Sequence, residues 1–474
     1  MHGKKTLSLL RSLSKSELAD FEKYLKLQLA NQPRALQTFR YLKRFYPNFG
    51  DRKRLEIGYA YQKIFGQPIS SSTNNRKNFL NILSDLNTCL KAFLILEKVN
   101  SKSLESRLLW TTILMERGLS DDFARHVSRL KTVVDQLSGK SITDHILGLI
   151  TNYLFYYKVL QNKIDPEIKA IRQAINALGN FYKVVRLKLA CEAVARTQLL
   201  YTQADPNPEE LHQIPRPGAG SPPLLHAYYQ SYQMIKTGQS THFTELESIL
   251  KKHKKEIAIE EQHILLSYLQ NFNSTQIRQQ NNTAWLKAHE LNRFGVEQGL
   301  FVRKGLISST QFNNIINAAC KAKAYHWAFD FIEKHEGFLA EHLRDSTTQL
   351  SKAIIYYEMK HFDQVLPLTL KLKFLDAFHA IRAKSLTLIA YYELGWDENT
   401  ISNFCLSFLG YLKRNRKLKK ETVEATENFI KLTRALNQNR IPKQNLAKRI
   451  LHTERLYFSQ WLLEKAQRKK ATRQ

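Results

Sequence analysis

A helix–turn–helix pattern recurs in the second half of the sequence, and it constrains the fold more than any other feature. Three segments carry this pattern: residues 318–332, 354–368 and 388–402. Their turns contain the aromatic residues Tyr325, Phe362 and Trp396, which are 37 and 34 residues apart. This period is the length of one helix–turn–helix unit, and such units bury their apolar faces by stacking on neighbours. The sequence therefore predicts an all-α protein, organised as an α-solenoid of degenerate repeats.

Composition supports long helices with few tight turns. The 474 residues include only 17 glycines and 12 prolines, whereas hydrophobic residues make up 43%, enough to build a core. Six of the prolines and two glycines fall within 204–223, a stretch that no helix can cross. We therefore expect two halves: an N-terminal helical region at 1–203 and helical repeats at 224–474, joined by a Pro-rich linker or loop at 204–223.

Local signals mark the ends of several helices. Ser14 and Glu17 fit a capping box, in which each side chain bonds the other residue's backbone N–H. Gly118 is placed to end a helix, and the acids at 121–122 suit the positive end of the next one. Pro442 is placed to open a single closing helix over roughly 442–465.

The repeat segments resemble the tetratricopeptide repeat. Tyr356 and Tyr357 are followed by the sequence Lys-His-Phe-Asp at 360–363, which matches the helix–turn signature of that family. Ala328 stands where the family has a small residue for close helix packing, but Val365 and Asn399 stand in the equivalent places. The resemblance implies an irregular superhelix and transfers no ligand-binding residues.

The whole chain also resembles a family of uncharacterised bacterial helical-repeat proteins. The resemblance rests on residues 13–26 near one end and residues 408–436 near the other. It implies no known activity.

Positive charge is concentrated at the two ends of the sequence. The net charge is +30; residues 1–98 hold 18 Lys and Arg against 7 Asp and Glu, and residues 413–474 hold 18 against 5. The densest run is a candidate anion-binding site, consisting of Lys413, Arg414, Arg416, Lys417, Lys419 and Lys420. Such cations attract nucleic acid or an acidic protein. They also complement the negative end of the preceding helix, so a structural role remains open.

Motifs for catalysis, cofactors and metals are missing from the sequence. Gly139-Lys140-Ser141 lacks the glycine five residues earlier that a phosphate-binding loop requires, since that position is Val134. His335 and His342 are seven residues apart, not the four that a zinc helix needs. The sequence therefore predicts no enzyme and no cofactor.

The spacing of the cysteines and the hydropathy of the chain indicate the cellular compartment. The four cysteines are far apart and form no CxxC pair. The N-terminus contains no secretory apolar run, and the best membrane candidate, 146–160, is too short to span. We expect a cytoplasmic protein without membrane contact.

Two functions remain open from the sequence. The first is a non-enzymatic scaffold or adaptor that binds an unidentified, possibly acidic, protein along its stacked helices. The second is a nucleic-acid-binding protein that uses its basic N- and C-terminal regions. The basic run contains none of the stacking aromatics that single-strand binders use, which favours the scaffold.

Overall fold

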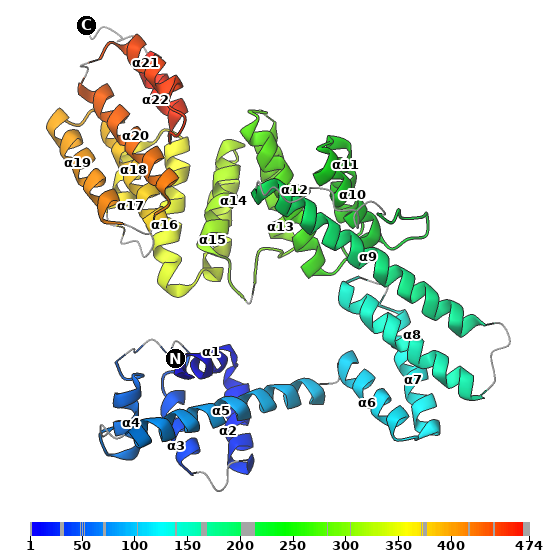
Figure 1. The fold of residues 1–474 in the computed structure, drawn as a ribbon. Coiled ribbons are helices and arrows are strands. Elements are labelled where there is room, and N and C mark those ends of the chain that lie inside the picture. The colour runs from blue at the N-terminus through cyan, green and yellow to red at the C-terminus, as the bar shows by residue number, and fades with distance from the viewer. Residues whose placement is uncertain are drawn as a thin grey trace. The chain divides into compact units, whose positions relative to one another are not determined.

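The fold is described from a computed structural model. It describes the chain except for residues 1, 29–32, 48, 50, 52, 70–72, 102, 138–139, 163–167, 201–213, 282, 304, 371, 373–376, 416–417, 439–440 and 468–474. Helices α1 to α22 make up 80% of the structure, and the described residues contain no strand (Figure 1). The prediction of an all-α fold is confirmed.

The chain folds as two compact units. The N-terminal unit comprises residues 1–138 and 142–181, and the C-terminal unit comprises residues 139–141 and 182–474. The division falls inside α9 (Lys169–Leu200), whereas the sequence predicted a linker at 204–223. Residues 214–222 are non-helical, as expected for that linker, and the predicted stretch at 204–213 lies outside the described residues.

The second half of helix α9 makes polar contacts with the C-terminal unit, which explains why the division falls inside this helix. Lys188 Nζ lies 3.0 Å from the buried carboxylate of Glu261, which also accepts a hydrogen bond from Tyr228. Tyr268 donates a second bond, of 2.8 Å, to Glu192. These polar contacts tie the second half of α9 to helices that follow the proline-rich stretch.

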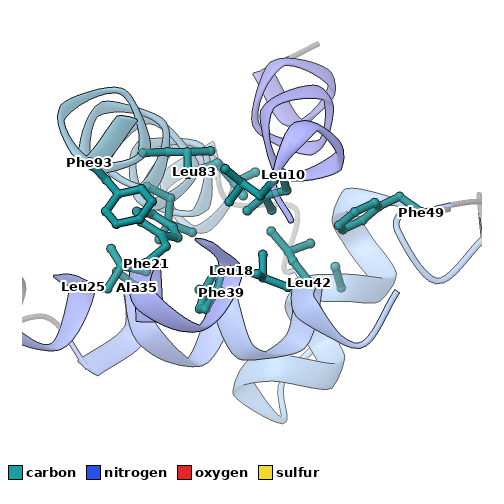
Figure 2. Packing of buried hydrophobic residues seen from close by; sticks show 14 of the residues in the cluster. Leu10, Leu18, Phe21, Leu25, Ala35, Phe39, Leu42, Phe49, Leu83 and Phe93 are labelled. Atoms are coloured by element: carbon teal, nitrogen blue, oxygen red, sulfur yellow. The ribbon is translucent and has the colours of Figure 1, made fainter. Parts of the chain in front are cut away.

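The N-terminal unit is built from helices with buried apolar faces. They are α1 (His2–Ser12), α2 (Lys15–Gln28), α3 (Pro33–Lys43), α4 (Ile57–Phe65), α5 (Thr73–Asn100), α6 (Leu104–Glu116), α7 (Ser120–Asp135) and α8 (Ile142–Asn162). Figure 2 shows Phe21, Phe39 and Phe93 meeting in one cluster, with the ring of Phe21 5.2 Å from Phe39 and 5.3 Å from Phe93. Rings at this spacing stabilise a core beyond their buried area alone.

The predicted capping box at the start of α2 is confirmed. The Ser14 backbone N donates to the Glu17 carboxylate at 2.6 Å, and the Glu17 backbone N donates to Ser14 Oγ at 3.2 Å. The pair satisfies two backbone donors that a helix start otherwise leaves open.

Helix α5 is long and apolar enough to cross a membrane by length and composition, over Asn75–Asn100. Core helices of folded proteins meet the same criterion when they are mostly buried, and 28% of this apolar window is buried. Phe79, Leu83, Leu86 and Leu90 of α5 lie in the buried cluster of the N-terminal unit.

The C-terminal unit continues with α10 (Pro223–Thr237), α11 (Ser240–Lys252), α12 (Ile259–Arg278), α13 (Ala284–Glu297), α14 (Ser309–Lys321), α15 (Tyr325–His335), α16 (Glu341–Glu358), α17 (Phe362–Leu370), α18 (Ala377–Glu393), α19 (Glu398–Arg414), α20 (Lys420–Gln438), α21 (Lys443–Leu451) and α22 (Ser459–Gln467). The three predicted repeat segments form the helix pairs α14–α15, α16–α17 and α18–α19. Tyr325 and Phe362 begin the second helix of their pairs, and Trp396 lies just before α19.

Five turns between paired helices share one geometry. A residue with positive φ follows the first helix in five pairs: Gly118, Gln280, Lys323, Lys360 and Gly395. The next N–H bonds back five residues, at distances from 2.8 Å (Ala324 N to Ala319 O) to 3.1 Å (Trp396 N to Tyr391 O). This is the Schellman turn, which satisfies carbonyls that the helix end leaves open. The predicted role of Gly118 is therefore confirmed.

The prediction of a single helix over 442–465 is wrong. Helix α21 ends at Leu451, and α22 begins at Ser459. Phe458, just before α22, has a φ of 55°, which a regular helix cannot contain. Its ring packs 5.1 Å from Phe429 and 5.8 Å from Tyr357. The helix is therefore interrupted at the residue whose ring packs on Phe429 and Tyr357.

Candidate functional site

The predicted basic run lies between α19 and α20. Lys413 and Arg414 form the last turn of α19, and Lys419 and Lys420 lead into α20; all four side chains are exposed. Arg416 and Lys417 lie outside the described residues. The four described cations make no ion pair within the described part of the chain. Their positive charge is therefore open to solvent.

One further cation lies close to this run. The pKa of Lys384 on α18 is lowered, chiefly by burial and also by the neighbouring guanidinium of Arg414. The Lys384 ammonium lies 5.3 Å from the centre of the Tyr411 ring. The structure thus adds one partly buried cation and one aromatic ring beside the predicted run.

A second candidate site is a groove of about 620 Å³ in the C-terminal unit. We call it the amide groove, because amide side chains dominate its lining: Gln270, Asn271, Asn273, Asn292, Gln311, Asn314 and Asn317. Trp285 adds an aromatic surface, and Lys321 and Arg382 add positive charge. The described lining residues include no carboxylate. The volume falls within the range of ligand-binding clefts.

Helix geometry places these amides together. On α14, Gln311, Asn314 and Lys321 recur at spacings that keep them on one face. The opposite face carries Phe312 and Ile316, which are buried, so packing of the apolar side turns the polar side toward the groove. Helix α14 also carries Asn317, helices α12 and α13 contribute the other amides, and Arg382 comes from α18 (Figure 1).

The groove amides fall into two groups. Asn273 is buried and donates to the Ala284 carbonyl at 2.9 Å, and Gln270 donates to Asn292 Oδ1 at 2.9 Å. The side chains of Asn271 and Asn314 are exposed and make no hydrogen bond within the described part of the chain. The first group holds the helices together, whereas the second leaves donors and acceptors open to a ligand.

Arg382 is the most unusual polar group of the groove. Its Nη2 lies 3.4 Å from Asn317 Oδ1, its guanidinium carbon lies 5.0 Å from the centre of the Phe458 ring, and its buried Nε has no hydrogen-bond partner. Burial lowers the pKa of Arg382, although an arginine keeps its charge at neutral pH. Arg382 is half-buried and makes no ion pair with a described residue, and Glu358 attracts it only from a greater distance. Partial burial of an unpaired charge is unfavourable, which makes this residue a candidate for function.

His289 lies behind the groove wall. It is buried on α13, its ring is 4.7 Å from the Trp327 ring, and its Nδ1 has no hydrogen-bond partner. Burial, followed by the nearby Arg293, lowers the pKa of His289. The neutral imidazole is therefore the favoured form. Within the described chain, no cluster of three or more His, Cys, Asp or Glu side chains could hold a metal ion.

Sequence reasoning missed the amide groove. The available signal was the spacing of Gln311, Asn314, Asn317 and Lys321 along one helix face, but a polar face of this kind also occurs on any solvated helix. The burial of Arg382 has no sequence signal, because charged residues are almost always exposed.

Comparisons were made with protein-family models, with curated proteins and with solved structures. None of them found a match.

Proposed function

We propose that this chain is a non-enzymatic protein-interaction scaffold, a degenerate tetratricopeptide-like α-solenoid that holds an extended segment of a partner protein in the amide groove. In this proposal the protein works in the cytoplasm and catalyses no reaction.

The open amides carry the proposal. A primary amide both donates and accepts hydrogen bonds, as a peptide bond does. Asn271 and Asn314 can therefore pair with the backbone of an extended segment, whatever its side chains. Trp285 offers an apolar surface for one side chain of that segment.

The solenoid part of the proposal is supported by the helix pairs. The five Schellman turns have the same backbone hydrogen bond. The first helices of successive pairs also contact one another, since α14 packs against α16 and α16 packs against α18. Stacked pairs of this kind create an extended concave surface.

A random peptide library displayed on phage tests the proposal. We expect the full chain to enrich a set of peptides, and the double variant Asn271→Ala, Asn314→Ala to bind them about tenfold more weakly. Asn399 on α19 is an exposed asparagine outside the groove, so Asn399→Ala is the matched control. No enrichment, or equal binding by the double variant and the control, would contradict the proposal.

Nucleic-acid binding is the second candidate, because the described cations of the basic run are exposed and free of ion pairs. Neutralising Lys413, Arg414, Arg416, Lys417, Lys419 and Lys420 together should then flatten the slope of log affinity against log salt by about one unit for each lost phosphate contact. If the wild-type chain is not retained on nucleic acid at about 50 mM salt, this candidate fails.

A further inference from the structure

Arg382 lies at the junction of two hollows of similar size. The amide groove measures about 620 Å³, and the second hollow measures about 640 Å³. The second hollow is lined by residues of α14, α16, α18 and α22, including Glu358, Glu393 and Glu464. Arg382 and Lys321 line both hollows.

Three of the other four cations that line the second hollow are paired with carboxylates, and the fourth, Lys323, is exposed and forms no ion pair among the described residues. Lys321 lies 2.9 Å from Glu358, Lys360 lies 3.6 Å from Glu464, and Lys465 lies 2.6 Å from Glu393. Arg382 forms no ion pair with a described residue: its hydrogen bond goes to the neutral amide of Asn317, and the charge of Glu358 acts on it only from beyond ion-pair distance. A guanidinium has five N–H donors, and most of them remain open here.

We propose that Arg382 binds the side-chain carboxylate of an Asp or Glu residue in the segment held by the amide groove. This inference rests on the proposed function, and it adds the chemical class of the partner: an acidic peptide segment.

The charge balance of the site favours a carboxylate over a phosphate. Glu358 pairs with Lys321 and attracts Arg382 only from a greater distance, so these two cations of the groove lining carry one positive charge in excess. A single guanidinium matches one carboxylate in charge and can bond both of its oxygens. A phosphate carries nearly two negative charges at neutral pH and would leave one unmatched.

The position of Arg382 favours an acidic side chain over a chain terminus. Because Arg382 borders both hollows, a bound chain can continue past it from the amide groove into the second hollow. A terminal carboxylate would suit a cation at a closed end of the groove. The ring of Phe458 and the amide of Asn317 hold the guanidinium at this junction.

Selected peptides and their matched analogues test the inference. The most enriched peptide from the phage selection on the full chain is synthesised in two versions, one with its acidic side chain and one with that side chain replaced by the amide (Glu→Gln or Asp→Asn). Each version is made with an amidated C-terminus and with a free C-terminal carboxylate. We expect an acid at a fixed position, and about tenfold weaker binding when that acid becomes an amide. Amidating the C-terminus should leave the affinity unchanged.

Variants of the protein assign this preference to one residue. Arg382→Gln should bind the acidic peptide and its amide analogue equally, and Arg382→Lys should keep part of the preference, because the charge remains and the planar fork is lost. Arg293→Gln removes an exposed cation outside the groove and should bind as wild type does. The unfolding midpoint of Arg382→Gln should change little, since the native guanidinium is half-buried and forms no ion pair with a described residue that the substitution would break.

Each other outcome overturns a stated part of the proposal. Enriched peptides without an acid, or a preference that survives in Arg382→Gln, would overturn the role of Arg382 and leave the groove intact. If only amidation of the C-terminus weakens binding, Arg382 binds the C-terminal carboxylate of the peptide and not an acidic side chain. Peptides that bind equally to the Asn271→Ala, Asn314→Ala variant would overturn the groove itself. If Arg382→Gln does not fold, the peptide analogues on the wild-type chain still decide the acid requirement.

Discussion

The two hollows beside Arg382 differ in how their polar groups are satisfied. In the second hollow, Glu393 accepts bonds from Trp461 Nε1 at 2.6 Å and from Lys465, so a carboxylate and an ammonium neutralise each other. In the amide groove, Asn271 and Asn314 are open and Arg382 forms no ion pair with a described residue. The volumes are nearly equal. Volume therefore does not distinguish the two hollows, whereas the unsatisfied donors and acceptors of the amide groove do.

The largest expected effect comes from breaking the buried ion pair of the second hollow. The side chains of Glu393 and Lys465 are only 12% and 10% exposed, so Glu393→Ala leaves a buried ammonium without its counter-charge. We expect a loss of about 3 kcal/mol in the free energy of unfolding, measured in urea. Lys360→Ala breaks a more exposed pair of the same hollow and should change stability by less than about 1 kcal/mol. Equal losses for both variants would show that the burial of an ion pair in this hollow does not set its contribution to stability.

An intermediate effect separates the two groups of amides within the groove. Asn273→Ala leaves the buried Ala284 carbonyl without its donor and should destabilise the unit by about 1–3 kcal/mol. Asn314→Ala removes an exposed amide without a protein partner and should change stability by less than about 0.5 kcal/mol. Thermal unfolding of both variants checks this order. A larger loss for Asn314→Ala would give that residue a structural role.

The smallest expected effect concerns pH. The folded-state pKa of His289 lies below its unfolded value, so the unfolded chain binds the proton more readily. Stability should thus be complete above a pH of about 6.5 and decline as the pH falls below it.

Unfolding curves of the wild type and of His289→Gln at pH 7.5 and 5.5 measure this contribution. We expect the variant to lose less stability than the wild type on acidification. An equal loss in both proteins would assign the pH dependence to other groups, such as His263, whose pKa burial also lowers.

Local features of the fold could be predicted from the sequence, and features that depend on distant contacts could not. The capping box at Ser14 and the turn at Gly118 are set by neighbouring residues, and the structure has both. The break before α22 was missed because Phe458 takes its positive φ where it packs on Phe429 and Tyr357. Nothing in the residues next to Phe458 indicates those contacts.

The candidate sites show the same limit. The basic run could be found because its charges are consecutive in the sequence, and its described residues are exposed as a turn between helices should be. The amide groove draws on four helices, and the contact between Asn317 and Arg382 joins residues 65 positions apart. Each polar face alone looks like a solvated surface. Only packing reveals that these faces line one groove.

The bond between Glu393 and Lys465 also sets an order of events during synthesis. The two residues are 72 positions apart, so a ribosome that adds about 5–20 residues per second makes the lysine several seconds after the glutamate. During that interval the helix hairpin α18–α19 can form through its own turn, while Glu393 and the surface that Trp461 later covers stay open to water and to chaperones. A nascent chain stalled before α22 would thus display an uncovered aromatic and acidic surface, a feature by which quality control can distinguish it from the completed fold.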